Sequence, residues 1–205
     1  LSSVSFPRVY TDAGSEKRYD AAGNELRPEQ VEVFRVEKHT LCGSEYNAGE
    51  AVSISLKAGE NTVAMRGIAE PMAVCEIRFH QKQPEPSYAE ASAAYTFPVA
   101  EEPIRLEGEA ATYRSDKSLY AVCDRSSGQS SPMALGKTVL NAVGGSNWKE
   151  PLQYIEWEFT VPRDGLYQLV IRGKQDITPG QISSRRLYID GEVPFAEARE
   201  LSFPY

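Results

Sequence analysis

Apolar and polar residues alternate in short runs along much of this 205-residue chain. In residues 51–59 (AVSISLKAG), Val52, Ile54 and Leu56 alternate with serines, and in residues 154–161 (YIEWEFTV) apolar side chains alternate with glutamates. Successive side chains of a β-strand point to opposite faces, so a period of two predicts strands with one buried and one wet face. This pattern limits the chain to folds built from paired strands.

Further runs of strand character are separated by glycine, proline and charged residues, and helical periodicity is scarce. The chain is therefore predicted to be all-β, an antiparallel sandwich with a few short helices. Short helices are expected at residues 27–33 (RPEQVEV) and from Ser87 to Tyr95. The additional strand runs are 60–67 (ENTVAMRG), 72–79 (MAVCEIRF), 165–173 (GLYQLVIRG) and 185–191 (RRLYIDG).

Charge and apolar content narrow the possible partners. The chain has 22 Lys and Arg against 29 Asp and Glu, a net charge of −7, with the basic residues scattered. This balance argues against nucleic acid or an anionic membrane as the main partner. The longest apolar runs fall far short of the ~20 residues of a membrane helix, so no direct membrane insertion is expected.

The three cysteines, Cys42, Cys75 and Cys123, have no metal-binding spacing and form no disulfide framework. Cys75 alternates with Ile77 and Phe79, so it is expected to be a small buried apolar residue.

Residues 80–103 differ from the rest of the chain. They contain four prolines, many alanines and few candidates for a core, which indicates a linker with one or two helical turns. The linker divides the chain into residues 1–79 and residues 104–205.

Several motifs after the linker resemble a known family. The sequence IRLEGEAATYRSD from Ile104 is followed by a Gly-Gly loop, a Trp-bearing strand and VPRDGLYQLVIR. This succession resembles the opening of galactose-binding-like jelly rolls in non-catalytic carbohydrate-binding modules. Residues 1–79, with LKAGENTVAM and MAVCEIRF, resemble the closing half of that fold. The motifs DRSSG, NAVGGSNW, SRRLYIDGEVPFAEA and DAAGNELRPEQV are similar to accessory modules of bacterial extracellular solute-binding lipoproteins of sugar transport systems.

The resemblance implies that the two halves stand in permuted order. The sequences VSFPRVY at residues 4–10 and LSFPY at residues 201–205 are nearly alike. Such similarity is expected if the chain spans one repeat length of a tandem array and begins and ends at the same internal point of two consecutive repeats. An isolated half-sandwich would leave an apolar face and open edges. Residues 1–79 and 104–205 are therefore predicted to complete one sandwich. The alternative is exchange between chains, which gives a domain-swapped dimer.

A carbohydrate site needs a flat apolar surface beside hydrogen-bonding groups. Trp148 lies in the polar loop GGSNWKEP and is either a sugar-stacking platform or the anchor of its loop, whereas Trp157 is expected on the core face of its strand. Arg185 and Arg186 either recognise a carboxylated sugar by bidentate pairing or pair with glutamates. The residues expected to help Trp148 are Tyr154, Arg172, Gln175, Asp124 and Arg125. For Asp124 and Arg125, in the sequence CDRSSG, the alternative is a salt-bridged turn capped by serines.

Calcium is the one cofactor that the resemblance suggests. In the resembled modules the two carboxylates of the first strand help to hold a structural calcium, which here implies Glu107 and Glu109. Cys75, however, stands where an acidic residue is expected, and a thiol is a poor ligand for calcium. Glu107 and Glu109 are therefore either calcium ligands or ordinary strand residues that face the solvent.

The expected function is that of a non-catalytic, extracellular or cell-surface carbohydrate-binding module within a larger bacterial surface or sugar-uptake protein. Its partners would be an oligo- or polysaccharide and other domains of the parent protein. The alternative is a ligand-free structural module that positions another domain. A glycoside-active enzyme is less favoured: Glu156 and Glu158 lie about 7 Å apart by strand rise, which overlaps glycosidase geometry, but nothing else in the chain suggests catalysis.

Overall fold

A computed structural model shows a mostly β protein with antiparallel sheets and almost no helix. It describes residues 7–38, 40–41, 51–69, 71–81, 84–93, 95–96, 98 and 102–205. The β class and the antiparallel pairing predicted from the sequence are confirmed. The finer prediction of a jelly-roll sandwich stays a prediction.

All ten described strands are only two to four residues long. They are β1 (Val9–Asp12), β2 (Arg18–Tyr19), β3 (Glu25–Leu26), β4 (Gln30–Val33), β5 (Tyr113–Arg114), β6 (Ala121–Val122), β7 (Ala142–Val143), β8 (Ile155–Glu156), β9 (Ile182–Arg185) and β10 (Leu201–Pro204). One α-helix, α1 (Tyr88–Ala93), and three 3-10 turns, η2 (Gly108–Ala110), η3 (Gly145–Asn147) and η4 (Ala196–Arg199), complete the described elements.

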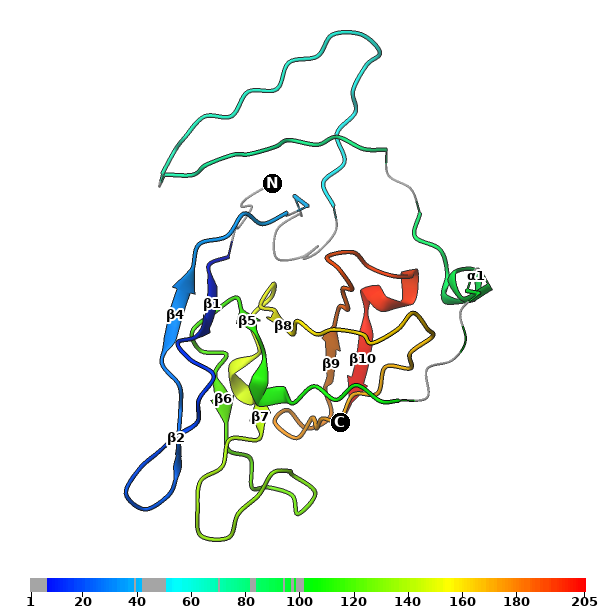
Figure 1. The fold of residues 1–205 in the computed structure, drawn as a ribbon. Coiled ribbons are helices and arrows are strands. Elements are labelled where there is room, and N and C mark those ends of the chain that lie inside the picture. The colour runs from blue at the N-terminus through cyan, green and yellow to red at the C-terminus, as the bar shows by residue number, and fades with distance from the viewer. Residues whose placement is uncertain are drawn as a thin grey trace. The chain divides into compact units, whose positions relative to one another are not determined.

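The largest sheet joins residues from both ends of the chain. Its strand order is β4-β1-β5-β8, all antiparallel, and Figure 1 shows β1 and β4 side by side. Val9 pairs with Val33, and Tyr10 lies opposite Arg114. Three two-stranded sheets, β9–β10, β2–β3 and β6–β7, are also antiparallel. The sheet therefore contains strands from both predicted halves.

The chain divides into two compact units. One comprises Leu1–Ser5 and Val36–Pro84, and the other comprises Phe6–Arg35 and Glu85–Tyr205. All the named strands belong to the second unit, as do both tryptophans. The completion of a single sandwich by residues 1–79 and 104–205 stays a prediction, as does the domain-swapped alternative.

One of the two predicted helices is confirmed. Helix α1 lies within the expected range from Ser87 to Tyr95. The hydroxyl of Ser87 accepts a hydrogen bond from the Glu90 backbone N–H (3.3 Å), and the Glu90 carboxylate accepts one from the Ser87 N–H (2.8 Å). This reciprocal capping box satisfies donors at the helix start, so a local sequence signal was sufficient here.

The predicted helix at residues 27–33 is wrong, because Gln30–Val33 form strand β4. All four of these residues pair with β1. A segment this short has weak helical propensity of its own, and the pairing partner decides its conformation.

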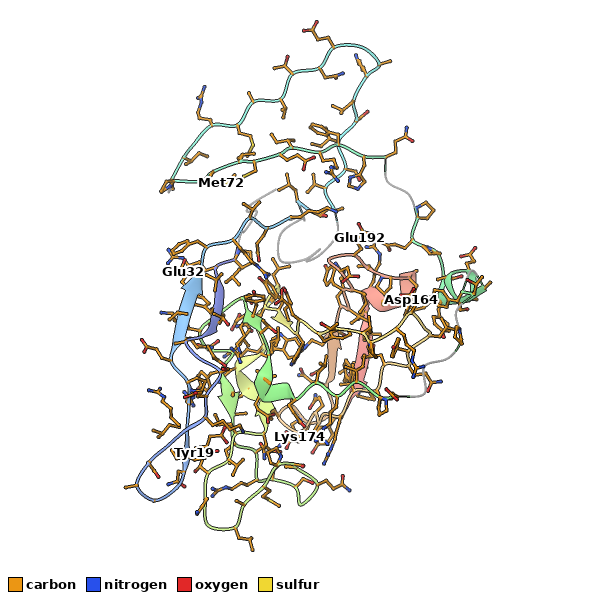
Figure 2. The ribbon with its side chains drawn as sticks, in the orientation of Figure 1. Tyr19, Glu32, Met72, Asp164, Lys174 and Glu192 are labelled. Carbon is orange, nitrogen blue, oxygen red and sulfur yellow. The ribbon has the colours of Figure 1, made fainter. Side chains whose placement is uncertain are left out.

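The three strands predicted in residues 51–79 are also wrong for the described residues. Residues 51–69 and 71–81 contain no strand beyond a single bridge, and their apolar side chains, except the half-buried Val52, are exposed. Met72, labelled in Figure 2, is one example, with 55 % of its surface exposed. Cys75 is exposed rather than buried, and Cys42 lies outside the described residues. Alternation supplies an apolar face, but a strand also needs a partner for its backbone.

The predicted strands of the C-terminal half are shorter than expected or displaced. Only Ile155–Glu156 of residues 154–161 form a strand, and residues 165–173 contain no more than a bridge. Strand β9 begins before the predicted run at 185–191, which contains only the last residue of β9, Arg185, and the bridge residue Ile189, paired with Glu192. In these segments, the strands predicted from apolar alternation are therefore longer than the backbone pairing that the structure shows.

The buried apolar core is small. Among the described residues, Leu119 and Ala198 are fully buried, and Val9, Ala111, Ala121 and Leu140 are almost so. Turn η2 packs on β7, since a Cβ added at Gly108 would lie 3.7 Å from the backbone nitrogen of Val143. None of the helices described is long and apolar enough to cross a bilayer.

Candidate functional site

The loop that carries Trp148 begins with two glycines in backbone conformations that other residues rarely adopt. Gly144 has φ of +89° and Gly145 has φ of +63°, and turn η3 follows. A Cβ at Gly144 would lie only 3.1 Å from Cε3 of Trp148. The glycine pair therefore both forms the turn and lets the indole ring pack against the backbone.

Gln153 closes this loop. The indole Nε1 of Trp148 donates a hydrogen bond to the backbone carbonyl of Gln153 (3.1 Å). The Gln153 side-chain oxygen accepts hydrogen bonds from the backbone N–H groups of Lys149 and Glu150, both at 3.1 Å. The half-buried ring is thus held in a fixed orientation with its polar hydrogen used inside the loop.

Arg185, from the end of β9, covers part of the Trp148 ring. Its guanidinium carbon lies 4.2 Å from the ring centroid, a cation–π contact. Its Nη2 donates to the Trp148 carbonyl (2.9 Å) and its Nη1 to the Ser184 carbonyl (2.7 Å). Trp148, Gln153 and Arg185 are called the Trp148 platform from here on. The sequence marked Arg185 as a sugar-binding candidate but carried no signal that placed it beside Trp148.

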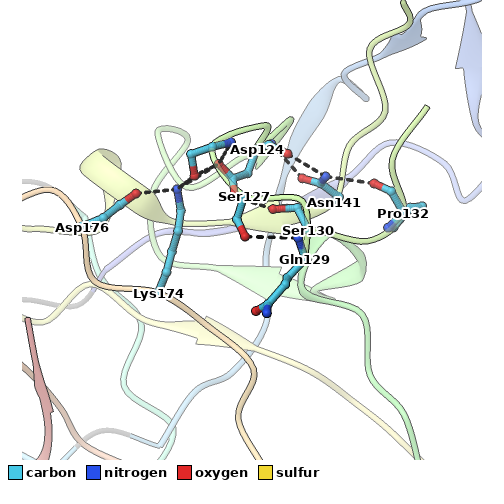
Figure 3. Close-up of polar contacts among 9 residues, drawn as sticks. Asp124, Ser127, Gln129, Ser130, Pro132, Asn141, Lys174 and Asp176 are labelled. Carbon is cyan, nitrogen blue, oxygen red and sulfur yellow. Dashed lines mark hydrogen bonds and ion pairs between the residues drawn. The ribbon is translucent and has the colours of Figure 1, made fainter. Parts of the chain in front are cut away.

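A second group of polar residues surrounds Asp124 (Figure 3). One carboxylate oxygen of Asp124 accepts hydrogen bonds from the Ser126 backbone N–H (3.1 Å), the Ser126 hydroxyl (2.9 Å) and the Lys174 ammonium (2.9 Å). The other oxygen accepts one from the Ser130 hydroxyl (2.7 Å). Asn141 links to the Asp124 backbone through its side chain, at 2.7 and 2.9 Å. We call these residues the Asp124 cluster.

Lys174 was missed by sequence analysis, although it adjoins the predicted Gln175. Its ammonium bonds to Asp124, to the Ser126 hydroxyl and to Asp176 (2.8 Å). Hydrogen bonds to Asp176 and Asp124 raise the pKa of Lys174, and the hydrogen bond from Lys174 leads those that lower the pKa of Asp124. The carboxylate of Asp124 is saturated by donors of its own chain, as in a cluster that organises a loop.

Acidification is expected to weaken the Asp124 cluster. The folded protein holds the pKa of Asp124 below its usual value near 3.8, so the associated stability is present above about pH 4 and is lost as pH falls further. Asp124→Asn should lower the free energy of unfolding at pH 7 by about 1.5 kcal/mol, the scale of hydrogen bonds to a charged group, and flatten its acid dependence. Urea titrations between pH 3 and pH 7 measure both effects.

Asp176→Asn is the control, because Asp176 contacts the same ammonium but its side chain is 44 % exposed. An exposed ion pair contributes less than about 1 kcal/mol. If the two variants lost equal stability, or if Asp124→Asn kept the acid dependence, Asp124 would not hold the cluster together.

The other residues predicted to bind ligand each contact different parts of the chain. Arg125 is exposed and donates to the Lys137 carbonyl and the Thr138 hydroxyl. Gln175 donates from Nε2 to the carbonyls of Gln181 (3.1 Å) and Thr178 (3.4 Å).

Tyr154 is half-buried, and its backbone N–H donates to the Ser115 hydroxyl (2.8 Å). Arg172 is exposed. Trp157, expected to be structural, donates its Nε1 hydrogen to the Glu107 carbonyl (3.0 Å).

The structure does not gather the predicted residues into one site. Strands β6 and β7 pair with Ala121 opposite Val143 and Val122 opposite Ala142. Asp124 follows β6 and therefore lies at the end of the pair where β7 begins, whereas Trp148 follows the other end of β7. The Trp148 platform and the Asp124 cluster are thus two separate places.

The predicted calcium ligands lie at a short 3-10 turn, η2, rather than on a strand. The Glu107 carboxylate pairs with Arg105 (2.7 Å). Burial raises the pKa of Glu109, which favours its neutral form and opposes cation binding. Across the described part of the chain, no group of three or more His, Cys, Asp or Glu side chains is placed to hold a metal ion.

No protein-family model, curated protein or solved structure matches this chain. What its sites do is therefore inferred from their own residues.

Proposed function

We propose that this chain is a non-catalytic carbohydrate-binding module of a larger bacterial extracellular or cell-surface protein, and that the Trp148 platform is its ligand site. The observation that carries the proposal is an oriented indole ring on a loop, with a guanidinium 4.2 Å from its centroid. The resemblance of the surrounding motifs to carbohydrate-binding modules supports the same function.

The platform has the two components that sugar binding needs. Trp148 is half-buried, so the residue keeps some accessible surface, and its indole is the kind of apolar group that contacts the C–H face of a pyranose. Arg185 and the backbone of the loop offer polar groups to its hydroxyls. Because Gln153 and the glycine pair already fix the ring, little side-chain entropy is lost on binding. A single shallow platform implies weak, reversible capture.

A ligand-free structural module is the second candidate, and one observation favours it. The indole N–H of Trp148 is bonded within its own loop, as expected of a residue whose task is to anchor that loop. The saturated Asp124 carboxylate is consistent with the same role.

Glycoside hydrolysis has less support. Both carboxylate oxygens of Glu156 accept hydrogen bonds from Arg35, at 3.2 and 2.9 Å. A carboxylate held in a bidentate ion pair is poorly placed to donate a proton to a leaving group. We therefore do not propose Glu156 and Glu158 as a catalytic pair.

Binding is expected to be lost when the ring is removed. On a glycan array at neutral pH, with and without calcium, Trp148→Ala should weaken binding at least about tenfold, equivalent to about 1.4 kcal/mol. Trp157→Phe is the matched control, because Trp157 is bonded to Glu107 and lies outside the platform. Silence across a broad array, from folded and monodisperse protein, would instead support the structural module.

A further inference from the structure

Arg185 differs in its contacts from three other buried or half-buried arginines. Arg35, Arg114 and Arg199 each hold a carboxylate, from Glu156, Asp12 and Glu85 respectively. Arg185 bonds only to two backbone carbonyls, and no carboxylate among the described residues lies within ion-pair distance. A half-buried cation in an acidic chain is thus without an anionic partner within the part of the chain described here.

The donors of Arg185 are only partly used. A guanidinium has five N–H groups. Two of them donate to the carbonyls of Ser184 and Trp148, and the others have no acceptor among the described residues. Burial lowers the pKa of Arg185, the direction expected for a cation that has left water without gaining a counterion. An anion that reaches this group would stabilise it.

The neighbouring ring defines what kind of anion fits. Arg185 lies against Trp148, so a ligand at the guanidinium also meets an aromatic surface. A carboxylate accepts two parallel hydrogen bonds from a guanidinium, and a pyranose ring stacks on an indole. We infer that the ligand of the Trp148 platform is an acidic saccharide, whose uronic acid carboxylate binds Arg185 while the sugar ring contacts Trp148. This inference rests on the proposed carbohydrate-binding function.

The test compares each sugar with a form that lacks only the charge. Uronic acid oligosaccharides and their methyl esters would be titrated into the whole chain by calorimetry. Because hydrogen bonds to charged groups contribute about 1.5–3 kcal/mol, the acid should bind at least about tenfold more tightly than its ester. Arg185→Gln should abolish this preference, and Arg185→Lys should retain part of it.

Arg163→Gln is the control, since it removes the same charge from a side chain that is 64 % exposed and pairs with Glu102, outside the platform. Tryptophan fluorescence of each variant would show whether the ring keeps its surroundings. Equal binding of acid and ester would overturn the acidic ligand but leave carbohydrate binding intact. A preference that persists in Arg185→Gln would overturn the role of Arg185. Binding of neither form, nor of neutral glycans, would overturn both proposals.

Discussion

Asp12→Asn is expected to lower the free energy of unfolding by about 3 kcal/mol, the lower end of the range for breaking a buried ion pair. Arg114 is completely buried and holds Asp12 by two hydrogen bonds, at 2.9 and 3.1 Å. The substitution leaves the guanidinium charge without a counterion inside the sheet. We place the loss at the lower end because the Asp12 side chain keeps 21 % of its surface exposed.

Glu32→Gln provides a matched control in the same sheet. Glu32 pairs with Arg8 at 3.3 Å, but the Arg8 side chain is 64 % exposed, so the loss should stay below about 1 kcal/mol. Denaturation in urea, followed by tryptophan fluorescence, reports on the unit that contains both pairs, because Trp148 and Trp157 belong to it.

The double variant Asp12→Leu with Arg114→Met distinguishes two causes of lost stability, an uncompensated buried charge and poorer side-chain packing. Replacing both charged partners by apolar residues should recover most of the stability lost in Asp12→Asn. If Asp12→Asn matched Glu32→Gln in its effect, the buried ion pair would not support the β1–β5 contact.

Leu119→Ala is expected to lower the free energy of unfolding by about 3 kcal/mol, because it removes a large apolar side chain and leaves a cavity. Leu119 lies between β5 and β6 and has no exposed surface. The core contains few buried apolar residues, so neighbouring side chains have little capacity to fill the space. The shift of the urea midpoint measures the loss.

Leu135→Ala is the same substitution at a residue that is 97 % exposed. Its effect should stay within about 0.5 kcal/mol, as for most surface changes. Similar losses in the two variants would mean that Leu119 is not the centre of the core.

The sequence was informative where a feature depends on neighbours along the chain. The helix was predicted within residues 87–95, where the structure shows a capping box between Ser87 and Glu90, and the loop at Trp148 was predicted from its Gly- and Asn-rich sequence. Both features involve residues only a few positions apart. The β class followed from alternation over a few residues, which is equally local.

The candidate site could be predicted only in part. Trp148 is recognisable because an aromatic residue in a Gly- and Asn-rich loop is unusual. The separation of Asp124 from Trp148 follows instead from how β6 pairs with β7. Lys174 was not predicted because Asp124, the partner that places it in the cluster, lies 50 positions away in the sequence. The nearby Asp176 alone does not indicate a cluster.

By itself, the sequence determined the β class with antiparallel pairing, the short helix near Ser87 and the glycine-rich loop at Trp148. Only the tertiary structure decided which strands pair, that Gln30–Val33 join a sheet, and that residues 51–69 and 71–81 form no strand. It also decided that Arg185 lies on Trp148, 37 positions away, and that Arg114 meets Asp12, 102 positions away. The physical reason is that periodicity specifies which face of a segment is apolar, whereas its partner is selected by long-range packing and charge compensation.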